Sequence, residues 1–336
     1  MTPDLPPALR AALDRALEGV PRKGLAERAA RTSAAYRAGR PSAGVIRDAE
    51  DALAYALTRL PATYAACATV LGEAARRAPG FAPASLLDAG AGTGAASWAA
   101  TEVWPKLGAV AWLDASPPFL SLARSLAADG PPALRNADGE RFDLTGRGPW
   151  PKAELVVASY ALAEIAPDRQ ASVMNELWAA CEGVLALVEP GTPAGYSRIL
   201  AARTALIGAG AQVLAPCPHA AACPLVGDDW CHFSVRLPRR RDHRLAKGAE
   251  VPFEDERFSY LLAARPGIAS AARRPRVLAP PRVGKPGVGL KLCGLDGQVE
   301  QRQVARRDKP AFALARRLAW GDTVEPTAEP PDAQEP

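Results

Sequence analysis

The sequence has no long uninterrupted apolar run and no basic N-terminal segment that leads into one. Its longest uncharged stretch, residues 204–227, is broken by three prolines and several glycines, so it does not predict a membrane span. A secretory signal is absent, and Asp4, Asp14 and Glu18 are untypical of an acid-poor transit peptide. We therefore expect a cytoplasmic protein with no membrane partner. The Ala-, Arg- and Pro-rich composition further suggests a bacterial source.

Histidine and cysteine are both scarce, with three and six residues. In a chain expected inside the cell, six cysteines favour metal binding or catalysis over disulfides. Cys217, Cys223 and Cys231 nevertheless fall within a few residues of one another, together with two of the histidines. Cysteines of a packed core have no reason to gather in this way. The stretch indicates a metal site whose fourth ligand comes from elsewhere in the chain.

Positive charge is concentrated in one part of the chain. Residues 236–317 hold 20 basic and 8 acidic residues, a net charge of +12, whereas residues 1–235 hold 21 and 23. A basic block of this kind favours a polyanionic partner such as RNA or DNA, and a merely solvated surface is the alternative. The candidate phosphate contacts are the basic residues at its start: Arg236, Arg239, Arg240, Arg241, Arg244 and Lys247.

Apolar strand-like segments alternate with helical segments between residues 84 and 190. This alternation predicts an α/β fold with a mostly parallel sheet, helices on both faces, and ligands bound at the carboxyl ends of the strands. The expected strands are 85–88, 109–113, 154–158 and 184–188, and the expected helices are 95–103, 117–127 and 169–181.

The flanking segments predict three further parts. An N-terminal helical region (1–80) precedes the α/β domain (81–215). A cysteine-cluster and basic β module (216–322) follows, within which a strand at 258–262 could complete the first sheet. The acidic, proline-rich tail (323–336) is expected to be disordered.

A glycine loop, Gly90-x-Gly92-x-Gly94, connects the first expected strand to its helix. The glycines alone fit a dinucleotide loop or a plain tight turn equally well. Asp88 at the strand end would repel a pyrophosphate but suits the ammonium group of S-adenosylmethionine (SAM). Asp114, at the end of the second strand, is placed to accept hydrogen bonds from ribose hydroxyls. These five residues predict a SAM site in a class I methyltransferase, or Rossmann-like, fold.

No catalytic residue can be assigned from the sequence. Residues 159–164, which follow the fourth strand, lack an Asn-Pro-Pro-Tyr motif for N-methylation and a cysteine nucleophile. Glu164 could act as a general base, but a surface carboxylate is the commoner explanation. Whether the protein is an enzyme therefore stays open.

The cysteine spacing leaves two kinds of metal site open. The intervals between Cys217, Cys223 and Cys231 are wider than those of zinc ribbons and fingers. They suit loops wrapped around an iron–sulfur cluster, which usually takes four thiolates. Cys293, at the end of an expected strand, is the best fourth candidate. A zinc site that uses the three loop cysteines and a nearby histidine is the alternative.

Several motifs, taken in order, resemble the methyltransferase-like small-ribosomal-subunit assembly family over about residues 40–322. The resemblance implies a SAM-methyltransferase fold that binds the small ribosomal subunit and its rRNA. It also implies a 4Fe-4S cluster on Cys217, Cys223, Cys231 and Cys293. The motifs that carry the resemblance are 87–94, 156–160, 188–193, 216–219, 230–233, 258–260 and 320–322.

Three functions remain open on this basis. The first is an assembly or translation factor whose cluster joins the basic β module to the α/β domain. The second is a catalytically active SAM-dependent rRNA methyltransferase. The third is an iron- or redox-sensing regulator of ribosome assembly. In each case we expect a monomer.

Overall fold

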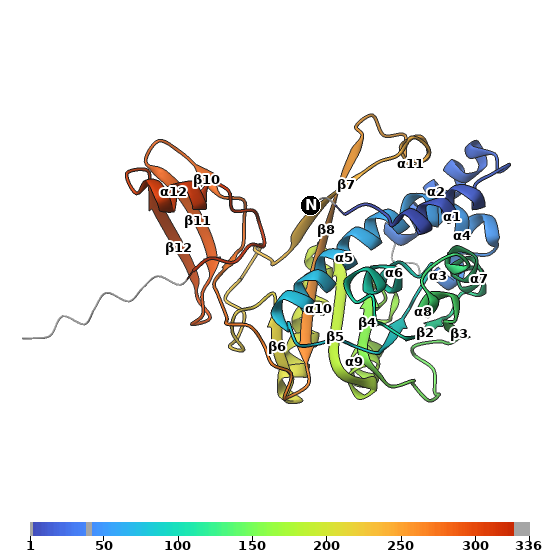
Figure 1. Cartoon of the computed structure of the whole chain (residues 1–336), viewed down its shortest axis with the longest axis horizontal. Coiled ribbons are helices and arrows are strands. Elements are labelled where there is room, and N and C mark those ends of the chain that lie inside the picture. Colours follow the sequence, from blue (N-terminus) through green and yellow to red (C-terminus); the bar gives the residue numbers. More distant parts are fainter. Residues whose placement is uncertain (1–2, 38–41, 326–336) are drawn as a thin grey trace, which may run out of the picture. The chain divides into compact units, whose positions relative to one another are not determined.

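The computed structural model describes residues 3–37 and 42–325 (Figure 1). Within them the chain forms two compact units. The first contains Met1–Ala215 and His232–Ser270, and the second contains Pro216–Cys231 and the residues from Ala271 onward. No helix in the described ranges is long and apolar enough to span a membrane.

The first unit begins with helices, as the sequence predicted. Asp48 caps one of them, since its side chain accepts a hydrogen bond from the Asp51 N–H at 2.8 Å. Pro61 lies in the first turn of the next, where its missing N–H costs nothing. The helices are α1 (Pro7–Ala16), α2 (Arg22–Arg37), α3 (Ser42–Val45), α4 (Ala49–Thr58) and α5 (Leu60–Arg77).

The strands that follow build one sheet in the order β3-β2-β1-β4-β5-β8-β6. The first five in this order are parallel, and β8 is antiparallel to both β5 and β6. This is the strand order of class I SAM-methyltransferases, so the predicted fold class is confirmed. The strands are β1 (Ser85–Ala89), β2 (Ala109–Asp114), β3 (Asp138–Arg141), β4 (Ala153–Ser159), β5 (Cys181–Pro190), β6 (Gln212–Ala215) and β8 (Phe253–Ala264).

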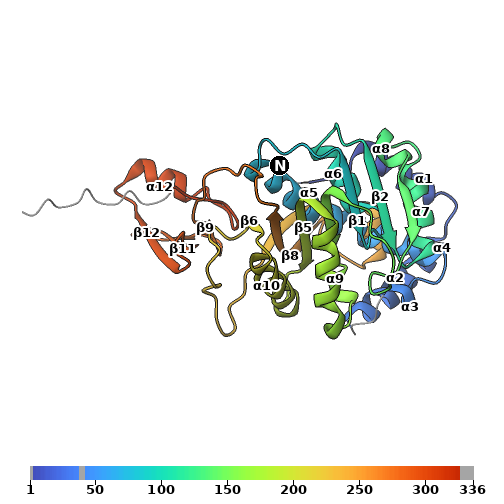
Figure 2. The same ribbon diagram turned by 90° about the horizontal axis from the view of Figure 1, so that it is seen from below.

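Helices cover both faces of this sheet and exclude water from it. In Figure 2, α5 and α6 lie on one side of the strands and α9 and α10 on the other. The central strands β1, β4 and β5 are almost fully buried, which accounts for their continuous apolar runs. The connecting helices are α6 (Ala95–Val103), α7 (Pro117–Ala127), α8 (Pro132–Arg135), η1 (Leu162–Glu164), α9 (Pro167–Ala180) and α10 (Pro193–Gly208).

The second unit is built on a small antiparallel sheet. Strand β11 (Gly287–Cys293) lies between β10 (Arg282–Val283) and β12 (Val299–Ala305), and β9 (Arg276–Val277) also pairs with β11. Helix α12 (Lys309–Ala315) packs against β11 and β12. Val277, Val288, Leu290, Leu292 and Ala315 form the buried core between them.

The two units do not follow the expected boundaries, because residues 232–270 return to the first. Strand β7 (Phe233–Pro238) pairs with β8, and helix α11 (Arg241–Ala246) lies in the connection between the two strands. Strand β8 is placed between β5 and β6 in the sheet. The first residues of the tail expected to be disordered are instead ordered, since Val324 is buried and its N–H donates to the Pro275 carbonyl. Residues 326–336 of that tail lie outside the described ranges.

Candidate functional site

The glycine loop lies between β1 and α6, at the carboxyl edge of the sheet. Gly90, Gly92 and Gly94 all have positive φ values, of 76°, 55° and 81°. At Gly90 a side chain is excluded twice, because a Cβ there would also lie 2.7 Å from the Cβ of Ala161. The loop is held in place by the Gly92 N–H, which donates to Asp114 Oδ2 at 2.7 Å.

Asp88, at the end of β1, is fully buried. Its Oδ2 accepts hydrogen bonds from the Ser97 N–H at 3.1 Å and the Ser97 hydroxyl at 2.7 Å. Its Oδ1 is buried without a hydrogen-bond partner among the described residues. Burial raises the pKa of Asp88 to about 6, although the Ser97 hydrogen bonds oppose the rise. A buried carboxylate oxygen that lacks a donor fits the ammonium group of SAM.

Asp114, at the end of β2, is also buried and holds the loop together. Besides Gly92, it accepts the Ser116 N–H on Oδ1 at 2.8 Å. Burial raises the pKa of this carboxyl, and the two backbone N–H groups oppose the rise. A ribose hydroxyl bound at the predicted position would share oxygens that already accept backbone hydrogen bonds.

A partly buried polar network that the sequence did not predict lies beside this loop. Tyr160, directly after β4, is the one non-glycine residue with positive φ (59°) in the part of the chain described. Its hydroxyl donates to Glu256 Oε1 at 2.8 Å, and Arg59 reaches both oxygens of Glu256 at 3.0 and 3.3 Å. The strand-end position of Tyr160 was the only available signal, because Arg59 and Glu256 lie far away in the sequence.

The four predicted metal cysteines all lie in the second unit. Cys217, Cys223 and Cys231 are half-buried in its loop, Cys293 is buried at the end of β11, and none forms a disulfide. Burial raises the pKa of the Cys231 thiol well above its ordinary value, and the other three thiols raise it further.

A histidine also approaches this group. His219 is buried, and its Nε2 lies 3.2 Å from the Cys293 sulfur. In the described ranges, no group of three or more His, Cys, Asp or Glu side chains is arranged to hold a metal ion. Four reduced thiols in one unit fit the donor set of an iron–sulfur cluster.

The six predicted phosphate contacts lie on β7, α11 and the residues beside them. Four of them form ion pairs within the first unit. Arg236 binds Asp255 through two hydrogen bonds of 2.7 and 2.8 Å, and Arg240 reaches Asp4 at 3.2 Å. Arg239 and Lys247 both bind Glu254, at 3.1 and 2.7 Å. Arg241 and Arg244 have no ion-pair partner among the described residues.

Glu254 explains why this segment is less basic than its sequence suggests. Burial would raise its pKa, but His243, Lys247 and Arg239 together hold the pKa well below its ordinary value. The carboxylate therefore stays ionised and neutralises charge that the sequence assigned to a partner. Much of the positive charge of residues 236–247 is used inside the first unit.

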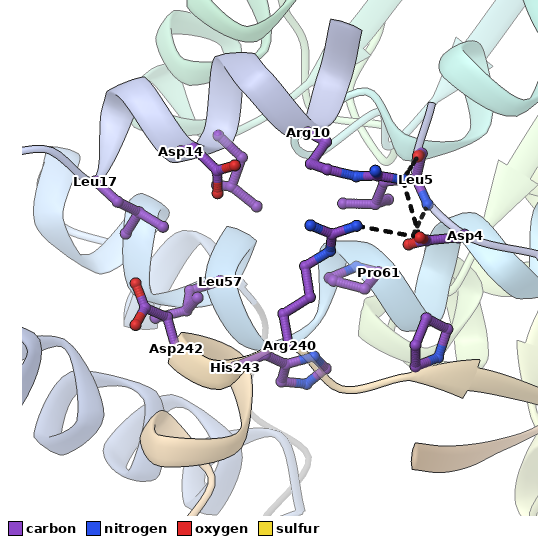
Figure 3. Close-up of a pocket in the computed structure, with 12 residues that line it drawn as sticks. Asp4, Leu5, Arg10, Asp14, Leu17, Leu57, Pro61, Arg240, Asp242 and His243 are labelled. Carbon is purple, nitrogen blue, oxygen red and sulfur yellow. Dashed lines mark hydrogen bonds and ion pairs between the residues drawn. The ribbon is translucent and has the colours of Figure 1, made fainter. Parts of the chain in front are cut away.

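A pocket opens between α1, α4, α5 and the β7–α11 segment (Figure 3). Its apolar wall is made by Leu13, Leu17 and Leu57. On the opposite side, Arg10 and Arg240 both point toward Asp4, with the Arg10 contact at 2.9 Å. The Arg240–Asp4 ion pair connects the residues before α1 to the β7–α11 segment.

Comparison with protein families gives one match over most of the chain. Residues 49–325 match the family described as mitochondrial small ribosomal subunit Rsm22. The matched range covers parts of both compact units, including the glycine loop and all four cysteines.

Two curated relatives are similar to the chain. "Ribosome assembly protein METTL17, mitochondrial" of Homo sapiens is 30% identical over 306 residues, which are 84% of this chain and 65% of that protein. "Rsm22-cox11 tandem protein 2, mitochondrial" of Schizosaccharomyces pombe is 27% identical over 285 residues, 70% of this chain and 38% of that protein. The chain thus spans less than two thirds of the length of either relative.

Solved structures are only distantly similar. The magnesium protoporphyrin IX methyltransferase of Synechocystis PCC 6803 with bound SAM is 15% identical, with a TM-score of 0.40. The match covers 60% of this chain and 79% of that one. A similarity of this size carries no information on activity.

The cytoplasmic, bacterial location expected from the sequence is wrong on this comparison. The matching relatives and the family description are mitochondrial. The expectation had rested on composition and on the first residues of the chain, and neither identifies a compartment.

Proposed function

Because the chain belongs to the mitochondrial small ribosomal subunit Rsm22 family, we propose that it assists assembly of the small ribosomal subunit. The observation that carries this proposal is the family match over residues 49–325, which includes both the methyltransferase-like sheet and the cysteine module. The name of the human relative, a ribosome assembly protein, supports it. Contact with small-subunit rRNA is the finer part of the proposal.

The four cysteines would hold a 4Fe-4S cluster in this protein. Such a cluster would cross-link the loop 216–231 to the end of β11, where Cys293 lies. The sequence suggested that this cross-link joins the β module to the α/β domain. All four candidate ligands belong to the second unit, however, so the cross-link would stabilise the fold of that unit alone. A zinc ion held by Cys217, Cys223, Cys231 and a nearby histidine remains the alternative.

SAM is the small molecule that the glycine loop would bind. The partnerless oxygen of Asp88 supports this, since an ammonium group would supply the missing donor. Gly90, Gly92 and Gly94 would allow close approach of the ligand, and Asp114 would contact its ribose. The second candidate function is that of an active rRNA methyltransferase. The partnerless Asp88 oxygen favours it too, because SAM would be the methyl donor.

Gradient sedimentation tests the assembly function directly. Tagged protein in cell extracts is expected to travel with small-subunit particles, and cells that lack it should accumulate immature small subunits. Sedimentation only with free protein, with subunit maturation unchanged in the deletion strain, would contradict the proposal. Mass spectrometry of rRNA from the same strain tests the second candidate, which requires the loss of a methyl group.

A further inference from the structure

One face of the small sheet in the second unit is only partly covered. Side chains alternate along a strand, so Val288, Leu290 and Leu292 of β11 point into the core with α12. Gly289 and the other odd-numbered residues of β11 point to the opposite face. On β12, Gln303 is paired with Gly289 and shares that face.

The cysteine loop contacts one end of this opposite face. Lys291 forms an ion pair with Asp229 of the loop, and Cys293 lies beside His219. These contacts come from the end of β11 at which it pairs with the start of β12.

The other end of the face is flat and polar. At Gly289 a Cβ would lie 3.3 Å from Gln303 Oε1 and 3.9 Å from the Cβ of Arg282, so both side chains flank the glycine on the same face. Gln301 and Gln303 are exposed, and so is Arg282. The glycine leaves backbone accessible between amide and guanidinium groups.

Exposed basic residues border this end of the face. Lys285 lies in the β10–β11 turn, and Arg306 and Arg307 follow β12. The Arg306 N–H donates to the Pro286 carbonyl at 3.0 Å, which brings the two turns together. None of these three basic side chains, nor Arg282, has an ion-pair partner within the described ranges, and the Arg306 guanidinium lies 5.6 Å from the ring centre of Phe312 on α12. The adjacent Asp308 carboxylate instead accepts the Ala311 N–H at the start of α12.

We infer that this surface, formed by Arg282, Lys285, Gln301, Gln303, Arg306 and Arg307, docks the phosphate backbone of an RNA segment. The inference rests on the proposed function and names its contact surface. Unpaired Arg and Lys side chains bind phosphates, and the exposed amides between them can hydrogen-bond sugars and bases.

An anionic membrane suits this surface less well. The exposed apolar side chain nearest to it, Val283, is paired with Val288 and therefore points to the α12 face. An interfacial membrane site needs apolar and basic groups on the same side. The β7–α11 segment suits RNA less well too, since most of its basic side chains are already paired.

The test compares two triple charge reversals in the full chain. The first changes Lys285, Arg306 and Arg307 to Glu. The matched control changes Arg273, Arg316 and Arg317 to Glu, which are exposed basic residues of the same unit outside this surface. Both alter the net charge equally, and thermal unfolding checks that both stay folded.

The probe is a fluorescein-labelled 20-nucleotide oligouridylate, measured by anisotropy at several salt concentrations. We expect the first variant to raise Kd at least tenfold and to lower the slope of log K against log salt by about 2, at ~0.7 for each lost contact. The control should stay within about threefold of the wild type. Equal weakening in both variants would overturn the inference.

Two further probes test the occupant. Polyglutamate is added as a competitor of the labelled oligouridylate, and anionic vesicles are tested for direct binding to the protein. If polyglutamate displaces the probe as well as unlabelled RNA of equal charge does, or if the protein binds the vesicles and not the RNA, the RNA assignment is overturned. Gradient sedimentation separates this inference from the proposed function. If the wild-type protein binds RNA through this surface but never sediments with small subunits, the proposed function alone is refuted. If the protein sediments with small subunits but the first variant binds RNA as well as the wild type does, the inference alone is refuted.

Discussion

Replacing Asp88 by Asn should change the pH dependence of stability in a defined direction. Burial raises the pKa of this carboxyl in the folded chain from 3.8 to about 6. Its stabilising contribution is therefore complete below about pH 4 and is lost as the pH rises through 6. At pH 7.5 the folded protein holds a buried charge that it would be more stable without.

The magnitude follows from the pKa difference. At ~1.36 kcal/mol per pH unit, ionised Asp88 costs about 3 kcal/mol at neutral pH relative to the unfolded chain. Asn keeps one acceptor for Ser97 and carries no charge, although its amide N–H groups then lack a partner. Because the unfolded carboxyl is already partly ionised at pH 4, the free energy of unfolding of Asp88→Asn, relative to the wild type, should rise by about 2.5 kcal/mol between pH 4 and pH 7.5.

Urea denaturation at both pH values measures this difference. Asp255→Asn is the matched control, because Arg236 lowers the pKa of Asp255 below its ordinary value of 3.8. Its stabilising contribution is lost only below that pH, so the difference between Asp255→Asn and the wild type should change little between pH 4 and pH 7.5. If the Asp88→Asn difference is the same at both pH values, the assigned pKa is refuted. Calorimetry with SAM adds a second readout, since loss of the carboxylate should weaken SAM binding while the fold is preserved.

Two further predictions concern the same edge of the sheet, and both are measured as unfolding free energies. Gly90→Ala should lower the free energy of unfolding by about 2 kcal/mol or more, because the new Cβ meets both a positive φ and a close contact. Gly92→Ala has open space around it and should cost about 1 kcal/mol through the positive φ alone. Similar losses in the two variants would contradict the close-contact argument. Arg59→Ala should cost about 3 kcal/mol, because Glu256 is left buried without its cation. Arg236→Ala, at an exposed pair, should cost less than about 1 kcal/mol, and a larger loss there would be inconsistent with the burial argument.

The sequence was most informative where local patterns determine structure. The strand at 85–88, the glycine turn after it and the position of Asp114 at a strand end could be predicted. The alternation of strand-like and helical segments and the placement of glycines are local signals. Strand β8 was less predictable, since its place between β5 and β6 depends on pairing partners 47 to 80 residues away.

The candidate sites show the same division. The composition of the cysteine stretch predicts a metal site, with Cys293 as the fourth candidate ligand because it ends a strand, and both stay predictions. The charge of residues 236–247 was misleading in isolation. Glu254, on the strand that follows, neutralises Arg239 and Lys247 only after β7 and β8 have paired. Charge summed along a sequence does not show which groups are already paired in the fold.

The role assigned to the cysteines is tested most directly by measuring iron and acid-labile sulfide in anaerobically purified protein. We predict about four iron and about four sulfide ions per chain in a brown protein, and the loss of both iron and sulfide in Cys293→Ser. Cys181→Ser, which changes a buried cysteine of the first unit, should retain them. A colourless protein with one zinc per chain, or full iron content in Cys293→Ser, would contradict the account.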